Sequence, residues 1–152
     1  MTAGESFNQL PNWAKGVIAV AAVAAIGFLG YNAYNAIKRR NEEKDIRKDE
    51  QSLKNDGQKP SFPDSNYKNF AEKIYQAGFV FGGTDENGIY DVFKQMKNDL
   101  DVVLLTKAFG TRRVEFSFQD ANLGGFLSSE LDSKEIGKLN SILESNGIKY
   151  RF

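Results

Sequence analysis

The chain has 152 residues with 20 basic and 20 acidic side chains, so no overall electrostatic field favours nucleic acid, and we expect no nucleic-acid partner. It contains no histidine and no cysteine, which excludes disulfides, thiol nucleophiles and the usual ligands of zinc, haem and iron–sulfur clusters. Because most common enzyme mechanisms need one of these groups, we predict a protein without catalytic activity and without a bound cofactor.

The first element is an uncharged run over residues 16–37, GVIAVAAVAAIGFLGYNAYNAI, which follows a short N-terminal segment over residues 1–15. As a helix this run would be about 33 Å long, enough to cross the apolar core of a bilayer. A cleavable signal peptide is the alternative interpretation. The chain start lacks a basic cluster, however, and the run is closed by three consecutive basic residues in the manner of a stop-transfer sequence. We therefore predict a single transmembrane helix.

The flanks of this run fit the two surfaces of a membrane. Aromatic and basic side chains prefer the headgroup region, and more basic residues follow the run than precede it. The positive-inside rule therefore predicts that the C-terminal part of the chain lies on the cytoplasmic or interior side. Small residues within the run would permit self-association of the helix. The expected membrane-interface residues are Trp13, Tyr31, Tyr34, Lys38, Arg39 and Arg40.

Residues 38–63 are expected to form a charged helical stalk and a linker. Charges of both signs stand four residues apart, as in the pair Glu43 and Arg47, which favours a solvated helix. Ile46 and Leu53 are apolar and seven residues apart, so a coiled coil stays open as an alternative. Gly57 and the two prolines after it then break the helix, and we place the start of a folded domain at residue 64.

Residues 64–152 show the apolar pattern of five short helices, each preceded by a capping residue. We expect the caps at Asp64 or Ser65, at Thr84, at Asn98 or Asp99, at Asp120 or Asn122, and at Asp132, with Glu135 completing a capping box. The predicted stops are Gly78, Gly110 and the pair Asn146 and Gly147. The predicted inner faces are Tyr67, Phe70, Ala71, Ile74 and Ala77; Ile89, Val92, Phe93 and Met96; Leu100, Val103, Leu104 and Ala108; Leu123, Phe126, Leu127 and Leu131; and Ile136, Leu139, Ile142 and Leu143.

Two segments depart from this helical pattern. Apolar and polar residues alternate over residues 114–118, VEFSF, and again over residues 148–152, IKYRF. We predict that the two segments pair as a small two-stranded ribbon, or pack together in extended form, and so tie down the end of the chain. The expected fold is thus mainly α, with this ribbon added to a small helical bundle.

The order of the pieces resembles one annexin repeat. The likeness is carried by GGTDENGIYDVF at residues 82–93, by LLTKAFG at residues 104–110 and by FLSSELDSKEIGKLNSIL at residues 126–143. In that family a calcium ion is held by carbonyl groups of the loop after the first helix and by a distant carboxylate, and it bridges to lipid phosphate. The resemblance implies that Gly83, Thr84 and Glu130 are the candidate metal ligands, and that calcium is the candidate ion.

The sequence departs from the family pattern in this loop. Phe81 stands where the family has its first loop glycine, and the loop is about two residues too long. A purely structural interpretation is also open, in which Thr84 caps the second helix and the acids after it complement the helix dipole. Phe79, Val80 and Phe81 would then fold back onto the core or form an apolar tip that contacts a partner or lipid.

Three functions follow from these observations. The first is a non-enzymatic membrane anchor or structural assembly component that presents a helical protein-interaction domain to other membrane, capsid or envelope proteins. Such designs suit membrane-containing virions and bacterial envelopes, and we favour the virion. The second is a calcium-dependent phospholipid-binding module. The third is a cell-wall glycosidase, because a pair of carboxylates needs neither histidine nor cysteine; the carboxylates available are Asp85, Glu86, Glu115, Asp120 and Glu130.

Overall fold

The computed structural model describes residues 40, 42–79, 83–114 and 120–152. In these ranges the chain is mainly helical, and a short ribbon of two strands is its other regular structure. Within the same ranges, none of the helices has the length and apolar character that crossing a bilayer requires. The predicted span over residues 16–37 lies outside them.

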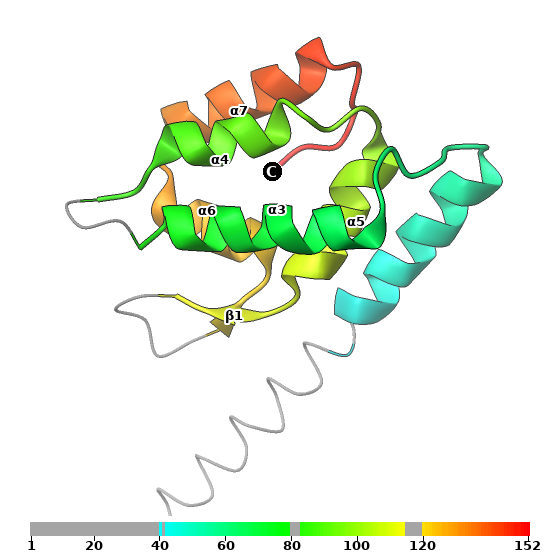
Figure 1. Ribbon diagram of the computed structural model, residues 1–152, viewed down its shortest axis with the longest axis horizontal. Coiled ribbons are helices and arrows are strands. Elements are labelled where there is room, and N and C mark those ends of the chain that lie inside the picture. Colours follow the sequence, from blue (N-terminus) through cyan, green and yellow to red (C-terminus); the bar gives the residue numbers. More distant parts are fainter. Residues whose placement is uncertain (1–39, 41, 80–82, 115–119) are drawn as a thin grey trace, which may run out of the picture. The chain divides into compact units, whose positions relative to one another are not determined.

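Glu43–Phe152 form one compact unit. After a helical stretch over residues 43–55, the labelled helices of this unit are α3 (Asp64–Ala77), α4 (Glu86–Phe93), α5 (Asp99–Phe109), α6 (Leu123–Glu130) and α7 (Ser133–Ser145). Helix α3 packs against both α4 and α5, α4 packs against α7, and α5 packs against α6 (Figure 1). These contacts enclose one apolar core.

Most of the predicted inner faces are confirmed. Every expected apolar residue of α3 is buried, and in α4 Ile89, Val92 and Phe93 are buried as well. Met96, just beyond the end of α4, is also in the core. The pattern works because apolar residues three and four apart lie on one side of a helix, so burying that side removes them from water together.

Several predicted helix ends are also confirmed. Asn98 caps α5 and Asn122 caps α6 through side-chain oxygens that accept backbone N–H groups. Asp132 and Glu135 form the expected capping box at the start of α7. The cap of α3 differs from the prediction, because Pro63 occupies this position and no side chain bonds the free N–H groups. Its fixed φ, here −61°, suits a helix start without that bond.

The ribbon is present but its predicted pairing is wrong. Strand β1 (Arg112–Arg113) pairs antiparallel with β2 (Asp120–Ala121), so the strands are two arms of one local hairpin. Residues 148–152 form no strand, and residues 115–119 lie outside the described ranges. A hairpin closes a much shorter loop than a pairing with the chain end would, so it costs less conformational entropy.

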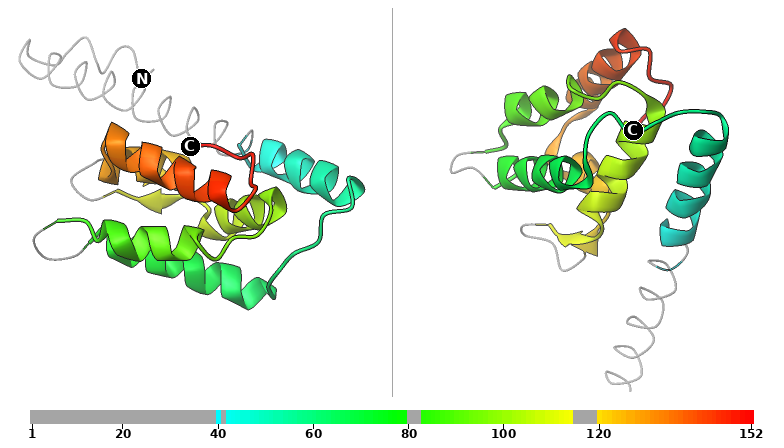
Figure 2. Two further views of the ribbon diagram at one scale, coloured as in Figure 1. Left: turned by 90° about the horizontal axis from the view of Figure 1, so that it is seen from above. Right: turned by 45° about the vertical axis from the view of Figure 1, so that its right-hand side comes forward.

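The end of the chain is nevertheless held on the unit, as Figure 2 shows for the segment that follows α7. Asp99 Oδ1 accepts the backbone N–H groups of Lys149 at 2.8 Å and Tyr150 at 2.7 Å. Asn140 bonds both the N–H and the C=O of Phe152, each at 3.0 Å. We call residues 148–152 the C-terminal strap. The side chains of Asp99 in α5 and Asn140 in α7 replace the strand partner that the alternating pattern led us to expect.

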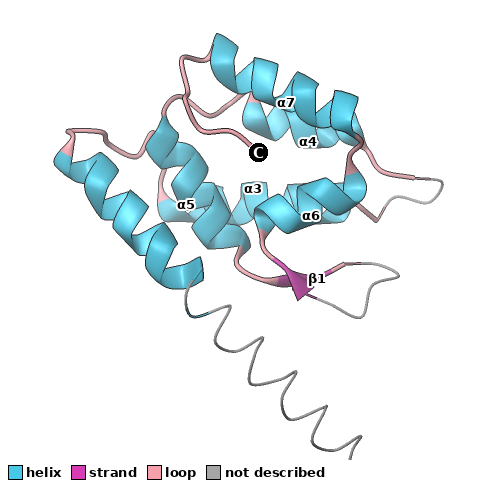
Figure 3. Cartoon of the chain, turned by 180° about the vertical axis from the view of Figure 1, so that it is seen from behind, coloured by secondary structure: helices cyan, strands magenta, loops and turns pink. Residues whose placement is uncertain are grey.

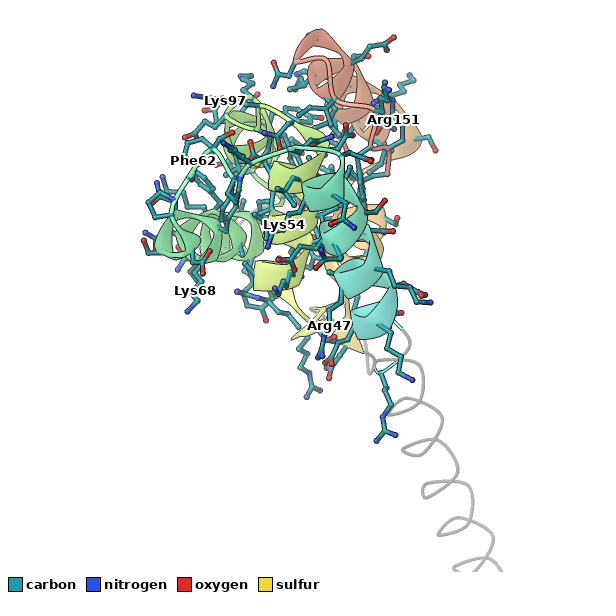
Figure 4. The ribbon with its side chains drawn as sticks, turned by 90° about the vertical axis from the view of Figure 1, so that its right-hand side faces the viewer. Arg47, Lys54, Phe62, Lys68, Lys97 and Arg151 are labelled. Atoms are coloured by element: carbon teal, nitrogen blue, oxygen red, sulfur yellow. The ribbon has the colours of Figure 1, made fainter. Side chains whose placement is uncertain are left out.

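The compact unit begins earlier than the predicted boundary at residue 64. Leu53 packs against the core, and Glu50 accepts hydrogen bonds from Lys54 at 2.7 Å and from Lys107 of α5 at 2.6 Å. Figure 4 labels Lys54 on this helical stretch. Phe62 lies edge-on to the rings of Tyr67 and Phe70. Residues 50–63 are therefore packed on the helical bundle through Leu53 and Phe62, whereas residues 43–49 are helical and mostly exposed, as expected of a solvated helix.

Candidate functional site

The loop between α3 and α4 is the place where the sequence predicted a site. Helix α3 ends at Ala77 with Gly78 as its C-cap, and the N–H of Asp85 donates to the C=O of Ala77 at 2.8 Å, which closes the loop. Gly83 has a φ of 141°, a conformation that glycine adopts readily and other residues avoid. The loop and the junction between α6 and α7 lie at the same end of the unit (Figure 3).

Close approach of α6 depends on the missing side chain of Gly78. A Cβ atom built on Gly78 would lie 2.5 Å from Cζ of Phe126 and 3.3 Å from Cγ of Glu130. Phe126 is fully buried and has no room to move aside. Glycine at this position therefore allows α6 to bring Glu130 to the loop.

Thr84 and Glu130 contact each other directly, 46 residues apart in the sequence. The Thr84 hydroxyl donates to Glu130 Oε2 at 3.1 Å, and the hydroxyl of Ser129 lies 3.4 Å from Oε1. The structure thus brings together two of the three residues that the annexin resemblance singled out. The third, Gly83, is their neighbour in the loop and is exposed.

The predicted role of Thr84 as a helix cap is wrong. Asp85 is the N-cap of α4, and its carboxylate accepts the N–H of Gly88 at 2.9 Å. The Thr84 hydroxyl is directed instead to Glu130 on α6. Both residue types can cap, and the aspartate stands one position nearer to the first helical residue.

Acidic side chains gather around Tyr90 at this end of the unit. The Tyr90 hydroxyl donates to the backbone C=O of Glu135 at 3.3 Å, and Lys138 lies over its ring at 4.4 Å. Burial raises the pKa of Tyr90, and the charges of Glu135, Glu86 and Asp132 raise it further. Even so, no cluster of three or more acidic side chains able to hold a metal ion occurs in the described ranges.

Phe79 turns back onto the helices. Its ring centroid lies 4.7 Å from that of Tyr75 and 6.3 Å from that of Phe126, and the side chain is half-buried. Of the two alternatives for the apolar tip, this residue takes the fold-back. Val80, Phe81 and the adjacent Gly82 lie outside the described residues.

Most of the predicted membrane-interface residues also lie outside the described residues, namely Trp13, Tyr31, Tyr34, Lys38 and Arg39. Arg40 is described and is exposed.

A second polar cluster was not predicted as a site, and it centres on Asp101. This side chain is fully buried, and its Oδ1 accepts the Tyr67 hydroxyl at 2.6 Å and the N–H of Ser61 at 2.9 Å. Its Oδ2 accepts the N–H of Lys97 at 2.9 Å. Burial raises the pKa of Tyr67, and the hydrogen bond to Asp101 raises it further. An aspartate in a first helical turn is a common capping pattern, so the sequence gives no signal of this wider role.

Beside this cluster is a shallow cavity of about 400 Å³. Its lining residues are Phe62, Lys94, Gln95, Met96, Lys97 and Asn146. The ammonium group of Lys97 lies 5.6 Å from the centre of the Phe62 ring, and Figure 4 shows both side chains at the same end of the unit. Asn146 is the other notable residue of this wall. The sequence marked it only as a helix stop, but its amide contacts three backbone carbonyls.

Comparison of the chain with protein-family models, curated proteins and solved structures found no match.

Proposed function

We propose that this protein is a non-enzymatic, single-span membrane protein that presents its helical unit to protein partners, as an anchor or structural component of an assembly. The observation that carries the proposal is the packing of residues 50–63 on the bundle. Only residues 38–49 separate this packed segment from the predicted span. Such a short connection suits a scaffold that displays a fixed surface better than a module that must search for a distant substrate.

The contacts of the carboxylates also support a non-enzymatic role. Asp85 uses its carboxylate to cap α4, and Glu130 accepts the hydroxyl of Thr84. These hydrogen bonds give each of the two carboxylates a structural role, so their presence needs no catalytic explanation. A cell-wall glycosidase would instead need two carboxylates free to face a sugar.

A membrane-containing virion is the setting that we favour for this function, with the bilayer and other capsid or envelope proteins as partners. We also propose a distant annexin-like arrangement for the unit. The order of its helices and the contact of Thr84 with Glu130 support that relation.

Membrane topology tests the anchor. The natural chain has no cysteine, so single cysteines introduced by Thr2→Cys and by Asp45→Cys report two positions without background. In sealed vesicles, a maleimide that cannot cross the membrane should label only one of the two variants, and detergent should expose the other. Labelling of both variants from the same side would contradict the single span.

The second candidate function is calcium-dependent binding of phospholipid, which the contact between Thr84 and Glu130 favours. Calcium takes about six to eight oxygen ligands, and Glu130 would be the one carboxylate that the resemblance supplies. Calorimetry on the full-length chain distinguishes the candidates. A calcium heat signal that Glu130→Ala abolishes and Glu144→Ala keeps would favour the calcium module. Our preferred function predicts no such signal.

A further inference from the structure

The side chain of Asn146 clamps the ends of two helices together. Its amide nitrogen lies 3.3 Å from the carbonyl oxygen of Phe93, 3.2 Å from that of Lys94 and 2.9 Å from that of Met96. The carbonyls at the C-terminal end of a helix lack intrahelical partners and carry partial negative charge. Asn146, which follows α7, therefore satisfies the end of α4 with the hydrogens of a neutral amide.

The C-terminal strap starts directly after this clamp. Gly147 has a φ of 73°, and its N–H donates to the C=O of Glu144 at 2.9 Å. The N–H of Ile148 donates to the C=O of Leu143 at 3.0 Å, and the Ile148 side chain is 1% exposed. This is the Schellman arrangement of a helix end, with its usual apolar contact. The strap thus leaves α7 in a direction that the clamp and Gly147 fix together.

The same two residues form a chemically labile pair. In an Asn-Gly sequence, the backbone nitrogen of glycine can attack Cγ of the asparagine, because glycine has no side chain to hinder the approach. The new C–N bond closes a succinimide ring and ammonia leaves. Water then opens the ring at either carbonyl, which gives aspartate or isoaspartate. The reaction consumes only water and needs no oxidant or cofactor.

We propose that Asn146 is a site of spontaneous deamidation, and that its conversion releases the C-terminal strap. In the folded unit both reacting groups are engaged in other hydrogen bonds, which hinders the attack. The Gly147 nitrogen donates to the C=O of Glu144, and the Asn146 amide contacts three carbonyls. The reaction therefore proceeds from states in which this helix end has opened. The product is a carboxylate, which has no hydrogen to donate and faces carbonyl oxygens of the same sign. The clamp cannot re-form.

The chain contains a matched control. Asn87 is also followed by glycine, but it is exposed and lies in the first turn of α4, where a negative charge is favourable. Asn146→Asp and Asn87→Asp make the same change of charge at opposite ends of helices. In the full-length chain, Asn146→Asp should lower the melting temperature by at least about 5 °C, whereas Asn87→Asp should leave it within about 2 °C. Trypsin should cut after Lys149 roughly tenfold faster in Asn146→Asp than in the natural chain, and Asn87→Asp should show no such increase.

Ageing of the natural chain tests the modification itself. After incubation at mildly alkaline pH, peptide mass spectrometry should find conversion of Asn146, faster in urea than in buffer, and enriched in molecules from which trypsin has removed residues 150–152. Equal melting and equal cleavage of the two variants would overturn the proposal. So would ageing that converts Asn87 and leaves Asn146 intact in urea, where the fold no longer protects either residue.

Discussion

Asp101 connects three segments of the chain through a single buried side chain. Its two oxygens accept hydrogen bonds from Ser61 in the linker, from Tyr67 in α3 and from the backbone of Lys97 before α5. A buried carboxylate is tolerated only when such donors replace its water. At the scale of one residue, Asp101 explains why the segment before α3 stays on the bundle.

Asp101→Asn should therefore destabilise the unit strongly. The amide keeps the shape of the carboxylate but turns one acceptor into a donor, which then faces N–H or O–H groups. We expect a loss of about 2–4 kcal/mol in the free energy of unfolding, measured with urea. Asp91→Asn is the control, because that side chain is 68% exposed in a surface ion pair, and it should change stability little. Equal effects of both substitutions would contradict this role of Asp101.

Among the helices, some ends match the sequence prediction and others differ from it. The capping box at Asp132 and the stop at Gly147 were predicted, because their bonds join residues close in the sequence. Thr84 was misassigned as a cap because the local pattern does not distinguish it from Asp85, and only the resemblance linked it to Glu130, 46 residues away. The ribbon was misassigned for a similar reason, since period-two patterns show that a segment is extended but not which segment it pairs with. The contacts of Asp101 and Asn146 are of the same long-range kind.

Alanine substitutions at two glycines, one inside α7 and one just after it, should change stability in opposite directions. Gly147 has a positive φ, so Gly147→Ala should cost about 1–2 kcal/mol of stability. Gly137 lies inside α7, and a Cβ there would meet no atom within 4 Å. Gly137→Ala should instead stabilise the unit by roughly 0.5–1 kcal/mol. Urea unfolding of both variants checks the pair, and a change of the same sign in both would refute this account of the helix end.

The contact of Glu50 with Lys107 of α5 should make stability depend on pH. Glu50 is 13% exposed, and its hydrogen bonds with Lys107 and then Lys54 hold its pKa below the ordinary value of 4.5. A lowered pKa in the folded state stabilises folding at pH values above 4.5, and this contribution disappears as the pH falls through the folded value. Glu50→Gln should thus cost up to about 1 kcal/mol at neutral pH and nothing in strong acid.

Glu43→Gln is the control for this effect. Glu43 forms an ion pair with Arg47 in the same helix, but its side chain is 66% exposed. Its removal should leave the urea midpoint unchanged at every pH. If Glu50→Gln destabilised the chain as much in acid as at neutral pH, the lowered pKa of Glu50 would not be the cause of the lost stability.

At the scale of the whole molecule, the unit from Glu43 to Phe152 is larger than the domain predicted from residue 64. Proline and glycine between residues 57 and 63 do end a helix, as expected, but a break in a helix is not a boundary of a domain. Two apolar residues of the segment, Leu53 and Phe62, pack on the core. A pattern with so few apolar positions could not reveal that they have a partner.

The proposed function depends on residues 16–37 as the membrane anchor of this unit. Alkaline carbonate extraction of membranes distinguishes an integral anchor from a peripheral attachment, when the full chain is compared with a chain that lacks residues 16–37. We predict that the full chain stays in the membrane pellet after the wash, because an integral helix is held by its apolar surface, while the shortened chain is released. Release of the full chain into the supernatant would contradict the anchor.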